Sequence, residues 1–161
     1  MDAKKVARYG LLLALALVLS YAESLVPLSV AVPGVKLGLP NLVVFFALYR
    51  LGVKEAATLS ILRVVLVSFL FGNAYSLWYS LAGAVLSFAV MLLMKKTGLF
   101  GYLGVSVAGG VCHNLGQITV AMLVLRSTAV VYYLPVLLVS GIAAGIAIGA
   151  AGAVLVKRIQ F

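Results

Sequence analysis

Long apolar segments separated by short polar breaks make up most of the chain. Six such segments are present, and each is a predicted helix: residues 9–30, 39–51, 55–71, 77–94, 103–125 and 133–156. A helix needs roughly 20 apolar residues to cross about 30 Å of hydrocarbon. The second segment falls short, so either it tilts little or the chain before it dips into the protein. The pattern predicts one all-α domain, residues 1–161, built as a bundle of six transmembrane helices.

The composition indicates that lipid surrounds most of this bundle. Of the 161 residues, 65% are hydrophobic and 9% are charged, with a mean hydropathy of +1.26. A soluble domain is normally about 25% charged, so this chain has too little polar surface to cover a globule in water. We therefore expect a multi-pass protein of the cell membrane, with the lipid bilayer as its first partner.

The basic residues are distributed unevenly between the predicted loops. The net charge is +9, but the basic residues lie between apolar runs and form no patch interleaved with aromatic residues, so nucleic acid is not an expected partner. Lysine and arginine concentrate in cytoplasmic loops. With the N-terminus inside, nine basic residues lie inside and two outside, which predicts that both termini are cytoplasmic. The inside set is Lys4, Lys5, Arg8, Arg50, Lys54, Lys95, Lys96, Lys157 and Arg158.

The first segment also resembles a signal peptide. Basic residues precede an apolar run that ends in Ser20-Tyr21-Ala22, which is similar to a small-x-small cleavage site. We favour a retained first helix, because further spans follow it.

Three ionisable residues fall inside predicted spans, where they are costly and indicate function. They are Glu23, Arg63 and His113. Arg63 either pairs with Glu23 to fix the helix register or faces a polar cavity that holds an anionic ligand. Glu23 and His113 are also the candidate proton carriers.

A polar cluster formed by His113, Asn114 and Gln117 marks the fifth segment. His113 and Gln117 are four residues apart and share a helix face. The cluster serves either hydrogen bonding between helices or recognition of a polar ligand group. One histidine supplies no metal-ligand set, so no metal site is predicted.

Two connections carry further candidate binding residues. Asn41 lies near a helix start, where free backbone N–H groups favour anions, and Lys36 adds charge nearby; ordinary helix capping is the alternative. At the outer end of the third and fourth segments, Trp78 fits an interfacial aromatic belt. The residues there that we expect to contact a ligand are Asn73, Tyr79 and Ser80.

Small residues repeat every four positions in the last segment, at Gly141, Gly145 and Gly149. Such a ridge lets another backbone approach closely. It predicts close packing within the bundle, with docking to a partner membrane protein as the alternative.

No enzyme signature is present in the chain. Prenyl-chain synthases need clustered carboxylates to hold magnesium and diphosphate, and this chain has three acidic residues in all. No phosphate-binding Walker motif occurs either. We predict a protein that is not an enzyme and has no prosthetic group.

Several motifs together resemble a known family. They are Lys36-Leu-Gly-Leu-Pro-Asn41, Arg63 followed by Phe71-Gly72, Tyr79-Ser80-Leu-Ala-Gly83, Gly104-Val-Ser-Val and His113-Asn114-Leu-Gly116-Gln117. The chain resembles the Gx transporter family, often labelled heptaprenyl diphosphate synthase component I. That family is similar to the substrate-binding S-components of energy-coupling factor vitamin transporters.

The resemblance implies a six-helix bundle with a ligand pocket that opens outward under the first loop, and a role in small-molecule transport. Relatives are encoded near machinery that attaches flavin to extracytoplasmic proteins, which implies a flavin (FMN, FAD or riboflavin) as the transported ligand. S-components commonly dock on an energising membrane protein through Ala-x-x-x-Ala in the first helix. The nearest match here is Ala16-Leu-Val-Leu-Ser20, so such a partner stays an open prediction.

Three hypotheses follow. In the first, the protein transports a phosphate-bearing flavin: Lys36 and Arg63 offset its charge, Asn41, Asn114, Gln117 and His113 bond its polar edges, and Tyr79 stacks on its ring. In the second, the protein is a membrane subunit that holds an isoprenoid diphosphate. In the third, it is a structural assembly factor that uses the glycine ridge.

Overall fold

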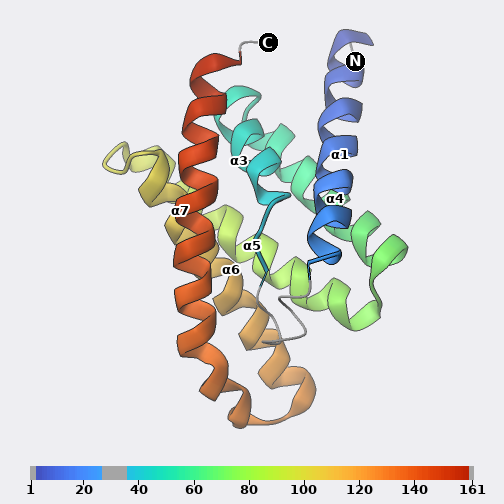
Figure 1. Ribbon diagram of the computed structural model, residues 1–161, viewed down its shortest axis with the longest axis vertical. Helices are drawn as coiled ribbons and strands as arrows, with labels where there is room; N and C mark the ends of the chain where they lie inside the picture. Colours follow the sequence, from blue (N-terminus) through green and yellow to red (C-terminus); the bar gives the residue numbers. More distant parts are fainter. Residues whose placement is uncertain (1–2, 27–35, 160–161) are drawn as a thin grey trace.

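Every element in the described part of the chain, residues 3–26 and 36–159 of a computed structural model, is helical (Figure 1). The elements are α1 (Ala3–Ser24), α3 (Asn41–Arg50), α4 (Val53–Phe71), α5 (Ala74–Thr97), α6 (Tyr102–Leu125), the 3-10 helix η1 (Thr128–Tyr133) and α7 (Leu134–Arg158). Each predicted segment contains a helix, and most boundaries agree within a few residues. The first helix is displaced: it begins at Ala3, and residues 27–30 of its predicted range lie outside the described residues.

Four of the described helical stretches are long and apolar enough to cross a membrane, namely α1, α5, α6 and η1 with α7. α3 has 10 residues, about 15 Å at 1.5 Å per residue, which is half of the hydrocarbon thickness. α4 has 19 residues, but Lys54, Glu55 and Arg63 interrupt its apolar run. The prediction of an all-helical membrane-type protein is confirmed, whereas the count of six spans is not supported.

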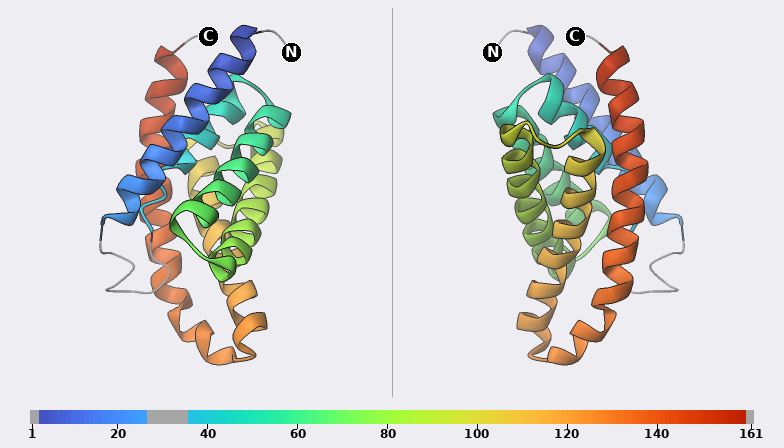
Figure 2. Two further views of the ribbon diagram at one scale, coloured as in Figure 1. Left: turned by 90° about the vertical axis from the view of Figure 1, so that its right-hand side faces the viewer. Right: turned by 90° about the vertical axis from the view of Figure 1, so that its left-hand side faces the viewer.

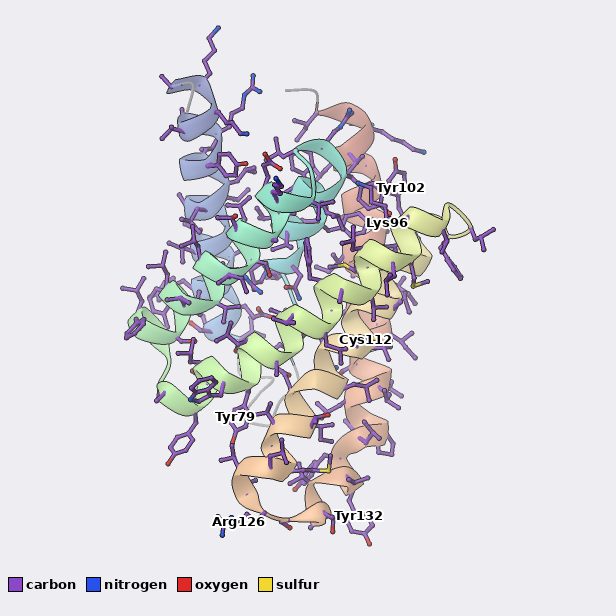
Figure 3. The ribbon with its side chains drawn as sticks, turned by 180° about the vertical axis from the view of Figure 1, so that it is seen from behind. Tyr79, Lys96, Tyr102, Cys112, Arg126 and Tyr132 are labelled. Carbon is purple, nitrogen blue, oxygen red and sulfur yellow. The ribbon has the colours of Figure 1, made fainter. Side chains whose placement is uncertain are left out.

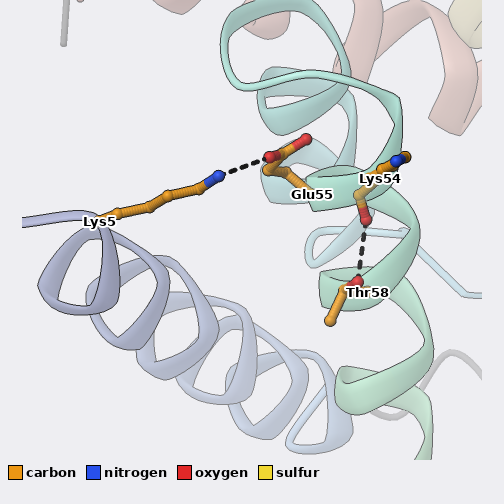
Figure 4. A network of polar contacts seen from close by, with 4 residues as sticks. All are labelled: Lys5, Lys54, Glu55 and Thr58. Atoms are coloured by element: carbon orange, nitrogen blue, oxygen red, sulfur yellow. Dashed lines mark hydrogen bonds and ion pairs between the residues drawn. The ribbon is translucent and has the colours of Figure 1, made fainter. Parts of the chain in front are cut away.

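The start of α1 and the end of α7 lie at the same end of the molecule (Figures 1 and 2). Lys5 there donates to the carboxylate of Glu55 at 3.0 Å and joins the start of α1 to the start of α4 (Figure 4). Lys95, in the last turn of α5, donates to the carbonyl of Leu48 at 2.6 Å. At the opposite end of the molecule, α6, η1 and α7 form a hairpin that extends beyond the other helices (Figure 2). Arg126 lies in this hairpin, far from Lys96 near the end of α5 (Figure 3).

α3 packs against α1, α4 and α7 in the half of the molecule where α1 begins and α7 ends (Figure 1). Residues 43–48 are all buried, as expected for a helix that is apolar on every face. The ring of Phe45 lies 4.9 Å from that of Tyr49 and 6.3 Å from that of Tyr102. The core therefore surrounds α3 in the half of the molecule that contains the chain ends.

The glycine ridge of α7 packs against α6 inside this protein. A Cβ on Gly110 of α6 would clash with the carbonyl oxygen of Gly141, and a Cβ on Gly145 would lie 2.6 Å from the Cα of Val107. The predicted packing within the bundle is confirmed. The ridge is covered by α6 and is not available to a partner.

Candidate ligand-binding cavity

A cavity of about 280 Å³ lies in the half of the molecule opposite the chain ends. Its walls come from the C-terminal end of α1, the segment 36–40, the second half of α4, the start of α5 and the middle of α6 and α7. Its volume is near the lower limit for small-molecule sites, about 300 Å³. The cavity is therefore large enough to hold a small ligand or one end of a larger one.

Most of the predicted binding residues line this cavity. They come from five separate parts of the chain: Glu23, Lys36, Asn41, Arg63, Ser80, His113 and Asn114. The fold thus brings together side chains that are up to 91 positions apart, from Glu23 to Asn114.

Three predicted residues lie outside the lining. Asn73 caps α5, where its Oδ1 accepts from the N–H of Ser76 at 2.9 Å. Gln117 packs on α5, with its Cγ 3.0 Å from where a Cβ of Gly83 would be. Tyr79 is one residue from Ser80, a rotation of about 100° around the helix, and only Ser80 faces the cavity.

Arg63 is the most buried charged residue of the site, with 8% of its surface exposed. Its Nη2 donates to the Oδ1 of Asn41 at 3.1 Å, and its Nε has no hydrogen-bond partner among the described residues. No direct ion pair joins Arg63 to Glu23 in the described structure, although their charges interact. The guanidinium is therefore held in place by Asn41, while its buried Nε makes no hydrogen bond among the described residues.

Glu23 instead holds the segment that precedes α3. Its carboxylate accepts a hydrogen bond from the N–H of Gly38, which has a φ of +74°. The N–H groups of residues 41–43 each donate to the carbonyl three residues earlier, at 2.8–3.2 Å. The prediction of free N–H groups at this helix start is wrong, because the turn before α3 already uses them.

The polar cluster of α6 divides between two roles. Asn114 Nδ2 donates to the carbonyl of Leu137 at 2.6 Å and lies 3.4 Å from the Oγ of Ser140, so it ties α6 to α7. His113 Nδ1 is buried without a partner among the described residues. The interpretation as hydrogen bonding between helices is confirmed for Asn114, whereas His113 lines the cavity and its role in ligand recognition stays a prediction.

The charges of the cavity sum to one positive charge, because Lys36 and Arg63 outnumber Glu23. Burial lowers the pKa of Lys36, and the carboxylate of Glu23 acts in the opposite direction. An excess of positive charge in a confined space attracts an anion. The electrostatics of the site are thus suited to an anionic ligand.

Sequence reasoning missed several lining residues, which are Ser20, Ser24, Ser68, Phe71 and Ser76. The serine pair at 20 and 24 carried a signal, since residues four apart share a helix face. Phe71 closes the α4 side, and its ring lies 5.4 Å from that of Tyr21.

The small-residue pair of α1 faces inward. Ala16 is 2% exposed and Ser20 is 8% exposed, and Ser20 lines the cavity. This pair is therefore not presented to a partner on the outer face of α1.

These features define a class: a helical, membrane-type protein with a positively charged internal cavity. Residues 12–155 match the family model described as heptaprenyl diphosphate synthase component I, and the chain belongs to that family. No curated protein and no solved structure matches the chain.

Proposed function

We propose that this protein binds a small anionic molecule in the cavity and transports it across the cell membrane, alone or as the substrate-binding subunit of a transporter. One observation carries the proposal: the guanidinium of Arg63 is buried in a positively charged cavity with its Nε unpaired. Glu23 interacts with this charge but forms no direct ion pair with it in the described structure, and a buried charge that lacks a paired counter-charge is strongly unfavourable in a protein interior. An anionic ligand in the cavity would supply a second negative charge close to Arg63.

The proposed orientation places both termini in the cytoplasm. The helix ends that carry the nine basic residues predicted inside gather at one end of the molecule (Figure 1). The positive-inside rule assigns that end to the cytoplasm, which places the cavity toward the opposite surface. The six-helix, S-component-like bundle is retained in this proposal with α3 as a half-length, enclosed helix.

We propose a phosphate-bearing flavin, FMN first, as the ligand. Lys36 and Arg63 would bind the phosphate or another anionic edge. Phe71 takes the stacking role that the sequence assigned to Tyr79, because Phe71 lines the cavity and Tyr79 does not. No catalytic step is part of the proposal.

The second candidate is a membrane subunit that holds an isoprenoid diphosphate. The description of the family favours it, and the same positive charge would suit a diphosphate. Catalysis would then require a separate subunit that supplies magnesium-binding carboxylates.

The test is a set of titrations with the protein purified in mild detergent. We expect the protein to bind FMN more tightly than riboflavin, and we expect farnesyl diphosphate to bind weakly. Arg63→Ala should weaken FMN binding by about 10- to 150-fold, since a hydrogen bond to a charged group is worth about 1.5–3 kcal/mol. Arg158→Ala is the matched control, because this arginine is exposed at the end of α7, far from the cavity.

Two results would contradict the proposal. If Arg63→Ala and Arg158→Ala weakened FMN binding equally, the cavity would not be the anion-binding site. If the protein bound farnesyl diphosphate and no flavin, the isoprenoid candidate would replace the flavin proposal.

A further inference from the structure

The segment 36–40 forms part of the cavity wall and carries one of the two cations that line it. Lys36 lines the cavity at the start of this segment. Asn41, directly after the segment, accepts a hydrogen bond from Nη2 of Arg63 at 3.1 Å. Both cations of the cavity are thus linked to the segment, Lys36 as a part of it and Arg63 through Asn41. The position of the segment therefore influences where both positive charges lie.

Few contacts of its own hold this segment in place. Residues 36–37 are exposed and residues 38–39 are half-buried, which leaves Pro40 as the buried member of the segment. The N–H groups of residues 41–43 donate to carbonyls within the same turn, so these bonds shape the turn but do not attach it to another helix. Regions with few buried contacts open at low cost. An anchor to another helix is therefore important here.

Glu23, near the end of α1, supplies such an anchor. Its carboxylate accepts a hydrogen bond from the N–H of Gly38. In the part of the chain that the structure describes, this is the one hydrogen bond that joins residues 36–40 to another helix. A hydrogen bond to an ionised acceptor is roughly twice as strong as one between neutral groups. A single side chain of α1 thus holds the segment that carries Lys36.

The turn that Glu23 holds lies directly against the partner of Arg63. Gly38 has a φ of +74°, a conformation that residues with a side chain rarely adopt. A Cβ there would lie 3.3 Å from Nδ2 of Asn41, the amide whose oxygen accepts from Arg63. One line of contacts therefore runs from Glu23 on α1, through the turn and the amide of Asn41, to Arg63 on α4.

We infer that Glu23 is a positioning residue for anion binding: it fixes this segment and thereby places Lys36 and Arg63 for the ligand. The inference rests on the proposed function, since it concerns the same anion in the same cavity. The carboxylate has two opposite effects, because its oxygen anchors the turn while its negative charge repels an anion. A glutamine separates the two effects, since its amide keeps an acceptor oxygen and has no charge.

The first experiment compares Glu23→Gln with Glu23→Ala in FMN titrations. Both substitutions remove the charge, but only Glu23→Gln keeps an acceptor for Gly38. We expect Glu23→Gln to bind FMN at least as tightly as the wild type, and Glu23→Ala to bind it about tenfold more weakly than Glu23→Gln, the effect of one hydrogen bond. Riboflavin has no phosphate and should bind to the two variants alike.

Glu55→Ala is the matched control for Glu23→Ala. Its carboxylate also accepts a hydrogen bond, from Lys5 at 3.0 Å, but it lies at the start of α4 and does not line the cavity. We expect Glu55→Ala to leave FMN binding unchanged.

The second experiment disturbs the turn without changing Glu23. Gly38→Ala is compared with Gly98→Ala, because both glycines have a positive φ, +74° and +68°, and both substitutions strain the backbone. Gly98 ends α5, and a Cβ there would meet nothing within 4 Å. We expect Gly38→Ala to weaken FMN binding and Gly98→Ala to leave it unchanged. Adding Glu23→Ala to Gly38→Ala should have little further effect, since both act on one turn.

Hydrogen exchange measured by mass spectrometry tests the anchor without any ligand. We expect the backbone N–H groups of residues 36–43 to exchange faster in Glu23→Ala than in Glu23→Gln. Equal FMN affinity of these two variants, equal exchange, or an equal loss of FMN and riboflavin binding in Glu23→Ala overturns the inference and leaves the proposed function standing. A wild-type protein that binds neither FMN nor farnesyl diphosphate overturns the proposed function as well.

Discussion

The α5–α6–α7 side of the molecule and the α1 side are held by different kinds of contact. α5, α6 and α7 meet backbone to backbone: a Cβ on Gly116 would lie 2.7 Å from the carbonyl oxygen of Ala82. On α1, a Cβ on Gly10 would meet nothing within 4 Å. α1 is attached by the side chains of Leu12 and Ala16 in the core and by polar contacts near its two ends, Lys5 with Glu55 and Glu23 with Gly38.

The difference bears on how the cavity works. His113 and Asn114 lie on the closely packed side, while Glu23 and Ser20 lie on α1. Interfaces of close-packed backbones resist deformation, whereas regions with few buried contacts open at low cost. We therefore expect ligand entry to move α1 and the segment 36–40, while α6 and α7 stay fixed.

The largest effect that tests this comparison is a methyl group at Gly110. We expect Gly110→Ala to destabilise the protein by about 1–3 kcal/mol, since overpacking against a backbone cannot be relieved by a rotamer change. Gly10→Ala should leave stability equal or raise it by up to about 1 kcal/mol, the difference in helix propensity. Size-exclusion profiles after stepwise heating measure both.

Gly104→Ala is the control within α6, because a Cβ there meets only the side chain of Phe100, at 3.5 Å. If Gly110→Ala and Gly10→Ala melt alike, the two sides do not differ in packing.

An intermediate effect is expected at the lysine pair of α5. Lys95→Met removes the donor to the carbonyl of Leu48, an acceptor at the C-terminal end of α3. We expect a loss of about 1–2 kcal/mol from the unpaired carbonyl and the lost helix-end charge. Lys96→Met, at an exposed neighbour, should change stability by less than about 0.5 kcal/mol. Equal melting temperatures for the two variants would exclude a role of Lys95 in holding α3.

The smallest effect is expected for the ion pair of Lys5 and Glu55, which water screens. The hydrogen bond from Lys5 lowers the pKa of Glu55, so the contribution of the pair is present at neutral pH and is lost as the pH falls through that lowered value. Glu55→Gln should leave the melting temperature at neutral pH almost unchanged. A clear drop would mean that α1 is attached more firmly than the packing indicates.

The sequence was sufficient to predict the helices, because apolar runs bounded by glycine and basic residues locate them directly. It also singled out Glu23, Arg63 and His113, since an ionisable side chain in an apolar run needs an interior partner. The span count failed at α3 and α4, where burial inside protein and burial in lipid select the same apolar residues. Tyr79 was assigned to the cavity together with Ser80, although only Ser80 lines it, because the rotation of a helix about its axis depends on packing that a single sequence does not encode.

The short length of α3 has a consequence for the order in which the chain is assembled. Ten residues, of which 43–48 are buried in protein, are too short for insertion as an independent span. We expect α3 to enter the bilayer only once the longer helices around it are in place, carried by the connections to α1 and α4. A ribosome-bound chain that ends before α7 would then lack one wall for α3, because α3 packs on both α4 and α7. The core around α3 is thus the last part of this protein to be completed.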